Sequence, residues 1–145
     1  MRSRPSGAVA GLYATTDRQR GPFKAPANAS LQAVLDVGHR LTMPQQEAMN
    51  ASVDGKAVNA LLVRPGRGVV VNAARTCDAN SREWRYVPVR RYMLAVERAV
   101  RARMQDYVFA SNDAQLWTNV RSMLAGFCNQ QFRSGALAGA TAEEA

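Results

Sequence analysis

The loop Arg64–Gly68, with the sequence RPGRG, brings basic side chains and glycines close enough together to hold a phosphate. A phosphate-binding loop leads from a strand into a helix, because the amides at the helix start must point at the anion. Here the loop leads into the apolar run Val69–Val71, and the chain has no GxxxxGK[ST] motif. We therefore interpret it as the turn of a β-hairpin formed by Val58–Val63 and Gly68–Ala74.

The residues that most often perform catalysis are few and scattered. His39 is the only histidine, Cys77 and Cys128 show no metal-type spacing, and the eleven acidic residues form no obvious pair. A serine or cysteine nucleophile needs a base within reach, and none is indicated. The sequence therefore predicts no enzymatic activity, no metal and no cofactor. The two cysteines fit small residues in a reducing compartment.

The chain is strongly basic, with a formal net charge of +8, and 17 of its 19 basic residues are arginine. Arginine presents a planar fork that suits carboxylates and phosphates, so we expect a partner with an acidic surface, unless the arginines only cover a solvated face. Because the basic residues recur along the whole chain, nucleic acid is the less favoured partner.

A basic nucleic-acid-binding module remains the alternative function. Arginines on one predicted helix, with aromatic rings nearby, could form a patch on which bases stack. The residues of this patch would be Arg98, Arg101, Arg103, Trp84, Tyr86 and Tyr92. No module signature accompanies them, so core aromatics and a solvated helix face explain the pattern better.

No segment is typical of a membrane protein or an export signal. No apolar run approaches the ~18 residues of a membrane span. The first residues, MRSRPSGAVAGLYA, are too short and too rich in glycine for the core of a signal peptide.

Hydrophobic spacing predicts the elements around the hairpin. Residues 1–27 are rich in Pro, Gly, Ser and Arg and are expected to form an extended leading segment with little regular structure. A short amphipathic helix is predicted over Leu31–Arg40, and a helical turn over Met43–Glu47 with Thr42 as its cap. Both hairpin strands are nearly continuous in apolar residues, which predicts strands covered on both faces.

Two long helices are predicted after the hairpin. Apolar residues at steps of three and four indicate helices over Val87–Val108 and Asp113–Phe132. Asn112, with Gln115 three residues later, resembles a capping box. The short connection predicts helices that pack as antiparallel or steeply crossed neighbours. The fold class is thus α+β, with a small mixed β-sheet and hairpin packed against two long and one or two short helices. Residues 28–133 form the core domain and 134–145 a tail.

Several short motifs, taken together, resemble the C-terminal domain of contractile tail sheath proteins. Such proteins occur in contractile phage tails, R-type bacteriocins and related bacterial injection particles. The resemblance runs from about Pro5 onward and is most specific at Pro65–Gly68, Ala74–Thr76, Trp84–Tyr86, Val89–Arg91, Asn112–Asp113, Leu116–Trp117 and Gly135–Leu137.

The resemblance implies a structural and mechanical function. Family members stack as rings or a helical sheath around an inner tube, which contraction drives through a membrane. The implied partners are further copies of the chain, the inner tube protein, and baseplate and tail terminator proteins, but neither a membrane nor nucleic acid. The implied location is a virion tail or phage-tail-like particle assembled in the bacterial cytoplasm. Extended arms from the two ends of the full protein add strands to a neighbour's sheet.

The resemblance also directs attention to the exposed arginines. Family members continue past Glu143–Glu144 into a last strand and an arm, which are expected to be absent from this chain. Arginines that meet an acidic tube surface would set register and still separate during sliding, because an exposed ion pair contributes only about 0–1 kcal/mol. The residues expected to contact the tube or a neighbour are Arg64, Arg67, Arg98, Arg101, Arg121 and Arg133.

Overall fold

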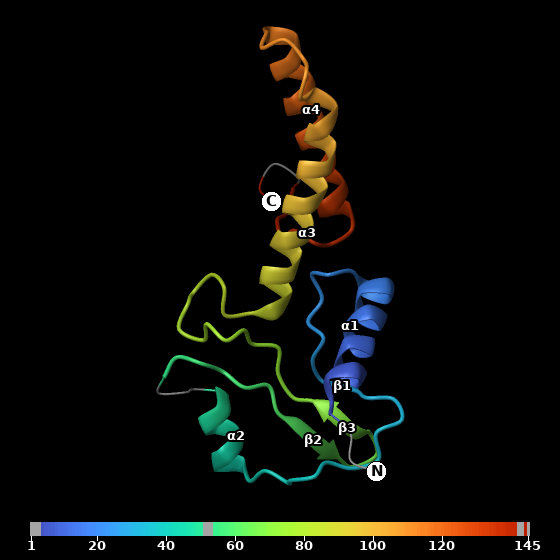
Figure 1. The fold of residues 1–145 in the computed structure, drawn as a ribbon, viewed down its shortest axis with the longest axis vertical. Helices are drawn as coiled ribbons and strands as arrows, with labels where there is room; N and C mark the ends of the chain where they lie inside the picture. Colours follow the sequence, from blue (N-terminus) through green and yellow to red (C-terminus); the bar gives the residue numbers. More distant parts are fainter. Residues whose placement is uncertain (1–3, 51–53, 142–143, 145) are drawn as a thin grey trace. The chain divides into compact units, whose positions relative to one another are not determined.

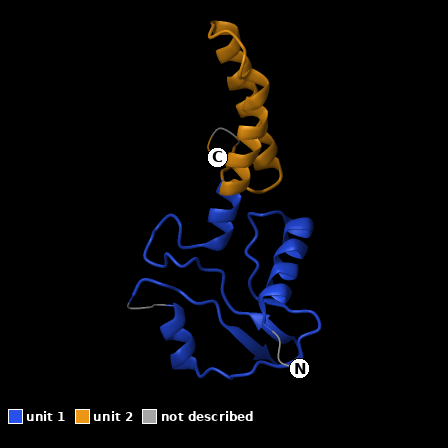
Figure 2. Ribbon diagram, viewed as in Figure 1, with its two compact units in different colours: residues 1–93 blue, residues 94–145 orange. Residues whose placement is uncertain are grey.

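The computed structural model describes residues 4–50, 54–141 and 144. The chain divides into two units, Met1–Met93 and Leu94–Ala145, called unit 1 and unit 2 below (Figure 2). The elements, labelled in Figure 1, are α1 (Ser6–Arg20), β1 (Ala29–Ser30), α2 (Met43–Asn50), β2 (Leu61–Arg64), β3 (Gly68–Val71), α3 (Val87–Met104), the 3-10 helix η1 (Gln105–Tyr107) and α4 (Ala114–Arg133). The predicted boundaries at residues 27 and 133 remain predictions.

A three-stranded sheet in the order β1–β3–β2 forms the centre of unit 1. The predicted hairpin is confirmed, with Leu61 opposite Val71 and Arg64 opposite Gly68. Gly66 and Gly68 adopt positive φ angles of 72° and 70°, which favour glycine. The α+β class is confirmed, but the described strands all pair antiparallel, whereas a mixed sheet was predicted. A tight turn joins β2 to β3, which permits only antiparallel pairing, and β1 also runs against β3.

The central strand β3 is buried on both faces, as the continuous apolar run predicts. Val69 and Val71 pack with Leu31 on the face covered by α1. Val70 packs with Ala60 and Leu62 on the opposite face, together with Leu41, which precedes α2, and Met49 of α2. The prediction is wrong for the end of β2, where Val63 and Arg64 are exposed, because no element covers them there.

The prediction that residues 1–27 lack regular structure is wrong, because Ser6–Arg20 forms α1. Gly7 and Gly11 lower helix propensity, and no neighbouring atoms lie where their side chains would project. The apolar residues of α1 lie on the other side of the helix and pack against the sheet; they include Ala8, Val9 and Leu12. Packing against the sheet thus outweighs the low intrinsic propensity of this segment.

The predicted helix over Leu31–Arg40 is also wrong, since these residues form turns and extended chain. The Leu31 N–H donates to the Val69 carbonyl at 2.8 Å, so the sheet has already engaged the backbone where the helix would begin. Ala33 then adopts a positive φ of 58°. The Asp36 side chain accepts a hydrogen bond from the Val37 N–H at 2.8 Å, which stabilises a turn in place of a helix.

The predicted helical turn at Met43–Glu47 is confirmed and extends to Asn50 as α2. The Thr42 N–H donates to the Gln45 side chain at 2.9 Å, and the Thr42 carbonyl accepts from the Gln46 N–H at 3.0 Å. The helix therefore begins where the sequence places its cap.

Within unit 1, an ion pair joins α1 to the start of α3. Both guanidinium nitrogens of Arg91 donate to the Asp17 carboxylate, one of them at 2.9 Å. The same guanidinium lies 4.8 Å from the centre of the Tyr13 ring. Tyr92 beside it is buried and meets Phe23 edge to face at 6.3 Å. These contacts fix the C-terminal half of α1 against the first turns of α3.

The two predicted long helices are confirmed, although α3 ends at Met104, four residues early, and continues as η1. After the turn the ribbon reverses direction into α4 (Figure 1). The N-cap of α4 is Asp113, whose Oδ1 accepts a hydrogen bond from the Leu116 N–H at 2.8 Å. The predicted cap, Asn112, instead accepts a hydrogen bond from the indole N–H of Trp117 at 3.0 Å.

Replacing Val69 with Ala should lower the free energy of unfolding by about 2 kcal/mol, because its side chain is fully buried. Val63 lies opposite Val69 in the ladder but is exposed, so Val63→Ala should cost less than about 1 kcal/mol. Urea unfolding followed by circular dichroism measures both. Equal costs would contradict the assignment of β3 as the core strand.

Replacing Asp113 with Ala should destabilise α4 by about 1 kcal/mol, because the first turn loses its capping acceptor. Asn112→Ala serves as the matched control and should leave amide hydrogen exchange in the first turn of α4 nearly unchanged. Faster exchange after Asn112→Ala than after Asp113→Ala would show that the cap is assigned to the wrong residue.

Candidate interaction surfaces

The outer edge of β2 is the first surface on which another chain could bind. The Asn72 N–H donates to the Ala60 carbonyl at 2.9 Å, so in the register of this hairpin alternate residues from Ala60 onward bond to β3. The backbone groups of Leu61 and Val63 therefore point away from β3. Within the described residues no strand lies beyond β2. Such an edge accepts an added strand.

Two hollows of unit 1 border this edge. One has a volume of about 300 Å³ and is lined by β2 together with Leu41 and Gln46. The other, of about 590 Å³, is lined mainly by residues 31–39 with Leu61 and the start of α1. Leu61 is the residue of β2 that lines the larger hollow, and it lines the smaller hollow as well. An extended segment paired with β2 would have space for side chains beside it.

Asp36 is the carboxyl group at the larger hollow. Its pKa is lowered from the ordinary value, mainly because the carboxylate accepts the hydrogen bond from Val37. The Arg40 guanidinium, 3.4 Å away, adds to this effect. The side chain is therefore an anion at neutral pH and pairs with Arg40 at the rim of this hollow.

Arg64 and Arg67 lie at the hairpin turn and differ in how they are held. Arg67 donates to Asn28 twice, to Oδ1 at 2.9 Å and to the carbonyl oxygen at 2.6 Å. Arg64 donates once, to Asn72 Oδ1 at 3.2 Å. Arg67 thus joins the turn to the residue that precedes β1, which gives it a structural role within the chain.

Basic and aromatic side chains gather in unit 1 in a set that shares Trp84 and Tyr86, but none of the arginines, with the predicted patch. Arg90 lies 5.0 Å from the Trp84 ring, and Arg75 and Arg85 lie 5.8 and 5.5 Å from the Tyr86 ring. The isolated bridge between Arg75 and Tyr86 brings these segments together. The predicted patch of Arg98, Arg101 and Arg103 lies in unit 2, and its third ring, Tyr92, is buried. Sequence spacing could not reveal the observed set, because the bridge creates it.

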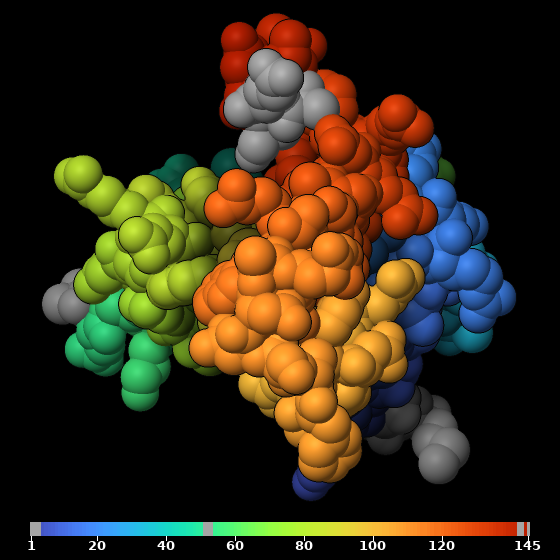
Figure 3. Space-filling view, turned by 90° about the horizontal axis from the view of Figure 1, so that it is seen from above, coloured from blue at the N-terminus to red at the C-terminus, as the bar shows by residue number. Residues whose placement is uncertain are grey.

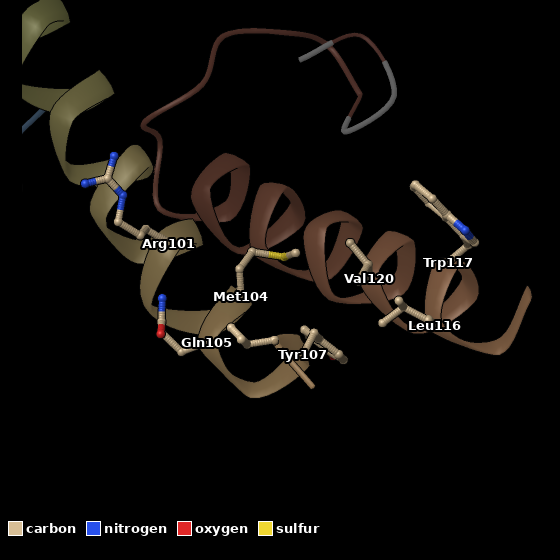
Figure 4. A pocket seen from close by; sticks show the side chains of 8 residues that line it. Arg101, Met104, Gln105, Tyr107, Leu116, Trp117 and Val120 are labelled. Carbon is tan, nitrogen blue, oxygen red and sulfur yellow. The ribbon is translucent and has the colours of Figure 1, made fainter. Parts of the chain in front are cut away.

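Unit 2 leaves much apolar surface exposed. No residue of α4 is buried, and Trp117 is 66% exposed. Near the reversal, Val108 and Phe109 are exposed as well, and Figure 3 shows this part of the surface uncovered. A pocket of about 370 Å³ lies beside them, lined by Arg101, Met104, Gln105, Tyr107, Val108, Leu116, Trp117 and Val120 (Figure 4). Apolar exposure of this extent marks an interaction surface.

The described residues contain no group of three His, Cys, Asp or Glu side chains able to hold a metal ion. Cys77 and Cys128 are free thiols at the surface. None of the described helices is both long and apolar enough to span a bilayer.

Solved structures of contractile particles are similar to nearly the whole chain. A chain from the sheath complex of an extracellular contractile injection system (PVC), in the contracted state, matches with a TM-score of 0.91 and 35% identity, over 97% of this chain and 39% of that chain. A chain from the helical sheath of the anti-feeding prophage, also contracted, matches with a TM-score of 0.88 and 39% identity, over 97% of this chain and 38% of that chain. The chain belongs to the sheath proteins of contractile injection systems.

A chain from the anti-feeding prophage baseplate structure is similar as well, with a TM-score of 0.89 and 39% identity over 96% of this chain and 37% of that chain. No protein-family model matches the sequence, and no curated protein does. This sheath chain thus spans less than two fifths of the length of the chains it matches. The structures to which it is similar come from sheath and baseplate assemblies.

The predicted contact arginines of this sheath chain do not form one cluster. Arg64 and Arg67 belong to unit 1, whereas Arg98, Arg101, Arg121 and Arg133 belong to unit 2 and are all exposed. Arg101 forms an ion pair with Glu97, at 2.9 Å. Their contacts with a tube or neighbour remain predictions.

The net charge is confined to unit 1. Fourteen of the 19 basic and six of the 11 acidic residues lie in Met1–Met93, which leaves this unit with the entire formal charge of +8. In Leu94–Ala145, five basic residues balance five acidic ones. An acidic partner is therefore attracted mainly to unit 1, while unit 2 can approach another copy of itself without net repulsion.

Replacing Arg67 with Ala should lower the free energy of unfolding by about 1 kcal/mol, because the turn loses two hydrogen bonds to Asn28. Arg64→Ala is the matched control on the same turn and should cost less than about 0.5 kcal/mol. Urea unfolding distinguishes the two. A larger loss after Arg64→Ala would contradict the structural role given to Arg67.

Proposed function

We propose that this chain is a structural subunit of a contractile sheath. In this function it associates with copies of itself in stacked rings or a helix around an inner tube, and its contraction drives that tube. The observation that carries the proposal is the similarity to contracted sheath structures, at TM-scores of 0.88 and 0.91 over 97% of the chain. The subunit performs mechanical work and catalyses no bond-making reaction.

The partners follow from this function. They are the inner tube protein, the baseplate and a tail terminator, and the assembled particle is a phage tail or a phage-tail-like device put together in the bacterial cytoplasm. The excess positive charge of unit 1 suits an acidic surface on such a partner. We retain the six exposed arginines named above as candidate contacts with the tube or a neighbour.

The free edge of β2 gives the subunit a way to stay linked to its neighbours. A strand donated by a neighbouring subunit would pair with the outward backbone groups of Leu61 and Val63. The donor's side chains would then reach the two hollows beside β2. Backbone pairing keeps subunits connected while their side-chain contacts rearrange, as a large motion of the assembly requires.

Electron microscopy of particles from bacteria that make this protein together with its tube protein tests the function. We expect rings or striated cylinders around a tube. A protein that stays monomeric beside its tube, or one that binds duplex DNA with a steep dependence on salt, would contradict the proposal.

Replacing Val63 with Pro tests the β2 edge. The outward N–H of Val63 is lost, so strand addition should fail and assembly should fall at least tenfold, while the isolated chain stays folded. Leu62→Pro removes an inward N–H and should instead unfold the sheet. Sedimentation measures assembly, and circular dichroism measures folding. Normal assembly of a folded Val63→Pro protein would exclude this edge as the link.

A further inference from the structure

The tip of unit 2, defined here as residues 105–113 between α3 and α4, carries an aromatic side chain that is not buried within the chain. Phe109 is 100% exposed, and Val108 next to it is 59% exposed. Water around a full phenylalanine side chain is released only when another surface covers it. Phe109 therefore has the character of an anchor for a partner.

The pocket of unit 2 is open and is partly formed by the tip, whose Gln105, Tyr107 and Val108 line it. Figure 4 shows Met104 and Tyr107 on one side, from the end of α3 and from η1, and Leu116 and Val120 on the other, from α4. Its lining is mainly apolar, and its volume of about 370 Å³ provides room for an aromatic ring.

The walls of this pocket are held in place before any partner binds. The indole N–H of Trp117 donates to Asn112 Oδ1 at 3.0 Å, although the ring is largely exposed. Asp113 fixes the start of α4 through its bond to the Leu116 N–H. Because these side chains are already ordered, binding at the pocket loses little further conformational entropy.

Charge around the tip favours a second copy of the chain as the partner. The tip contains two acidic residues, Asp106 and Asp113, and no basic one. The last turns of α3 before it contain three arginines, Arg98, Arg101 and Arg103, and Arg101 lines the pocket. A tip that enters the pocket of another copy thus brings its carboxylates toward that copy's arginines.

We propose that Phe109 of one copy inserts into the pocket of unit 2 of a second copy. This contact rests on the proposed sheath function and names one of the surfaces through which subunits meet. Tyr107 and Val108 of the tip also line the receiving pocket, so the donating and receiving surfaces adjoin on each copy, and two copies can exchange their Phe109 side chains reciprocally. One ring buries only about 150–250 Å², so the contact acts together with other interfaces of the assembly and does not by itself hold a dimer.

Assembly of Phe109→Ala protein tests the contact. The side chain is fully exposed, so the variant should fold normally, while the critical concentration for assembly should rise at least about tenfold. Met43→Ala is the matched control, because Met43 is 64% exposed but lies in unit 1, and it should assemble like the unaltered protein. Sedimentation across a concentration series measures each value.

Disulfide crosslinking identifies the partner directly. In a background of Cys77→Ser and Cys128→Ser, which removes both exposed thiols, Phe109→Cys protein is mixed with Val120→Cys protein and oxidised during assembly. We expect a crosslinked pair of the two variants, and none when Met43→Cys replaces Phe109→Cys. A reversal of charge at Asp106, Asp106→Arg, should raise the critical concentration, and Arg101→Asp in the same chain should restore it in part.

The outcomes separate this contact from the sheath function. If the unaltered protein assembles, and Phe109→Ala protein assembles equally well without a Phe109→Cys to Val120→Cys crosslink, the contact is wrong and the function stands. If Phe109→Ala leaves self-assembly intact but weakens retention of the tube protein, Phe109 contacts the tube and the proposal is overturned. If the unaltered protein does not assemble, the sheath function itself fails.

Discussion

Burial of β3 on both faces is the interaction on which unit 1 depends. Val69 and Val70 are almost completely inaccessible to water, and each contributes on the order of 1.5–3 kcal/mol through its buried apolar surface. Because neighbouring residues of a strand point to opposite faces, one strand needs two covers. The chain supplies α1 for one face and the α2 region for the other. This requirement places β3 between β1 and β2 and leaves β2 at an edge.

Buried apolar surface is distributed unevenly between the two units. The hydrophobic core clusters lie in unit 1, whereas α4 has no buried residue among those described. A chain that folded only for its own stability would cover residues such as Phe109 and Trp117. Their exposure fits the proposed role as an assembly subunit, in which a neighbouring copy covers these side chains.

The two units also differ in net charge. Unit 1 carries all of the net positive charge, and unit 2 has balanced charge. When subunits associate, the positively charged units 1 of different copies repel one another unless an acidic partner lies between them or the subunits are arranged so that these units stay apart. Balanced charge makes unit 2 the better surface for contacts between copies. The arginines of unit 1 and those of unit 2 therefore lie in different electrostatic surroundings.

Local pattern by itself determined the hairpin, the two long helices and the start of α2, because turn glycines, helical spacing and caps act within a few residues. The sheath motifs could be recognised for the same reason. Tertiary structure alone decided that Ser6–Arg20 is a helix and that Leu31–Arg40 is not, since both outcomes depend on contacts with β3, some 40 to 60 residues away. It also decided which groups remain free: β3 pairs with only one edge of β2, and the pocket near Phe109 forms where the end of α3 meets the start of α4.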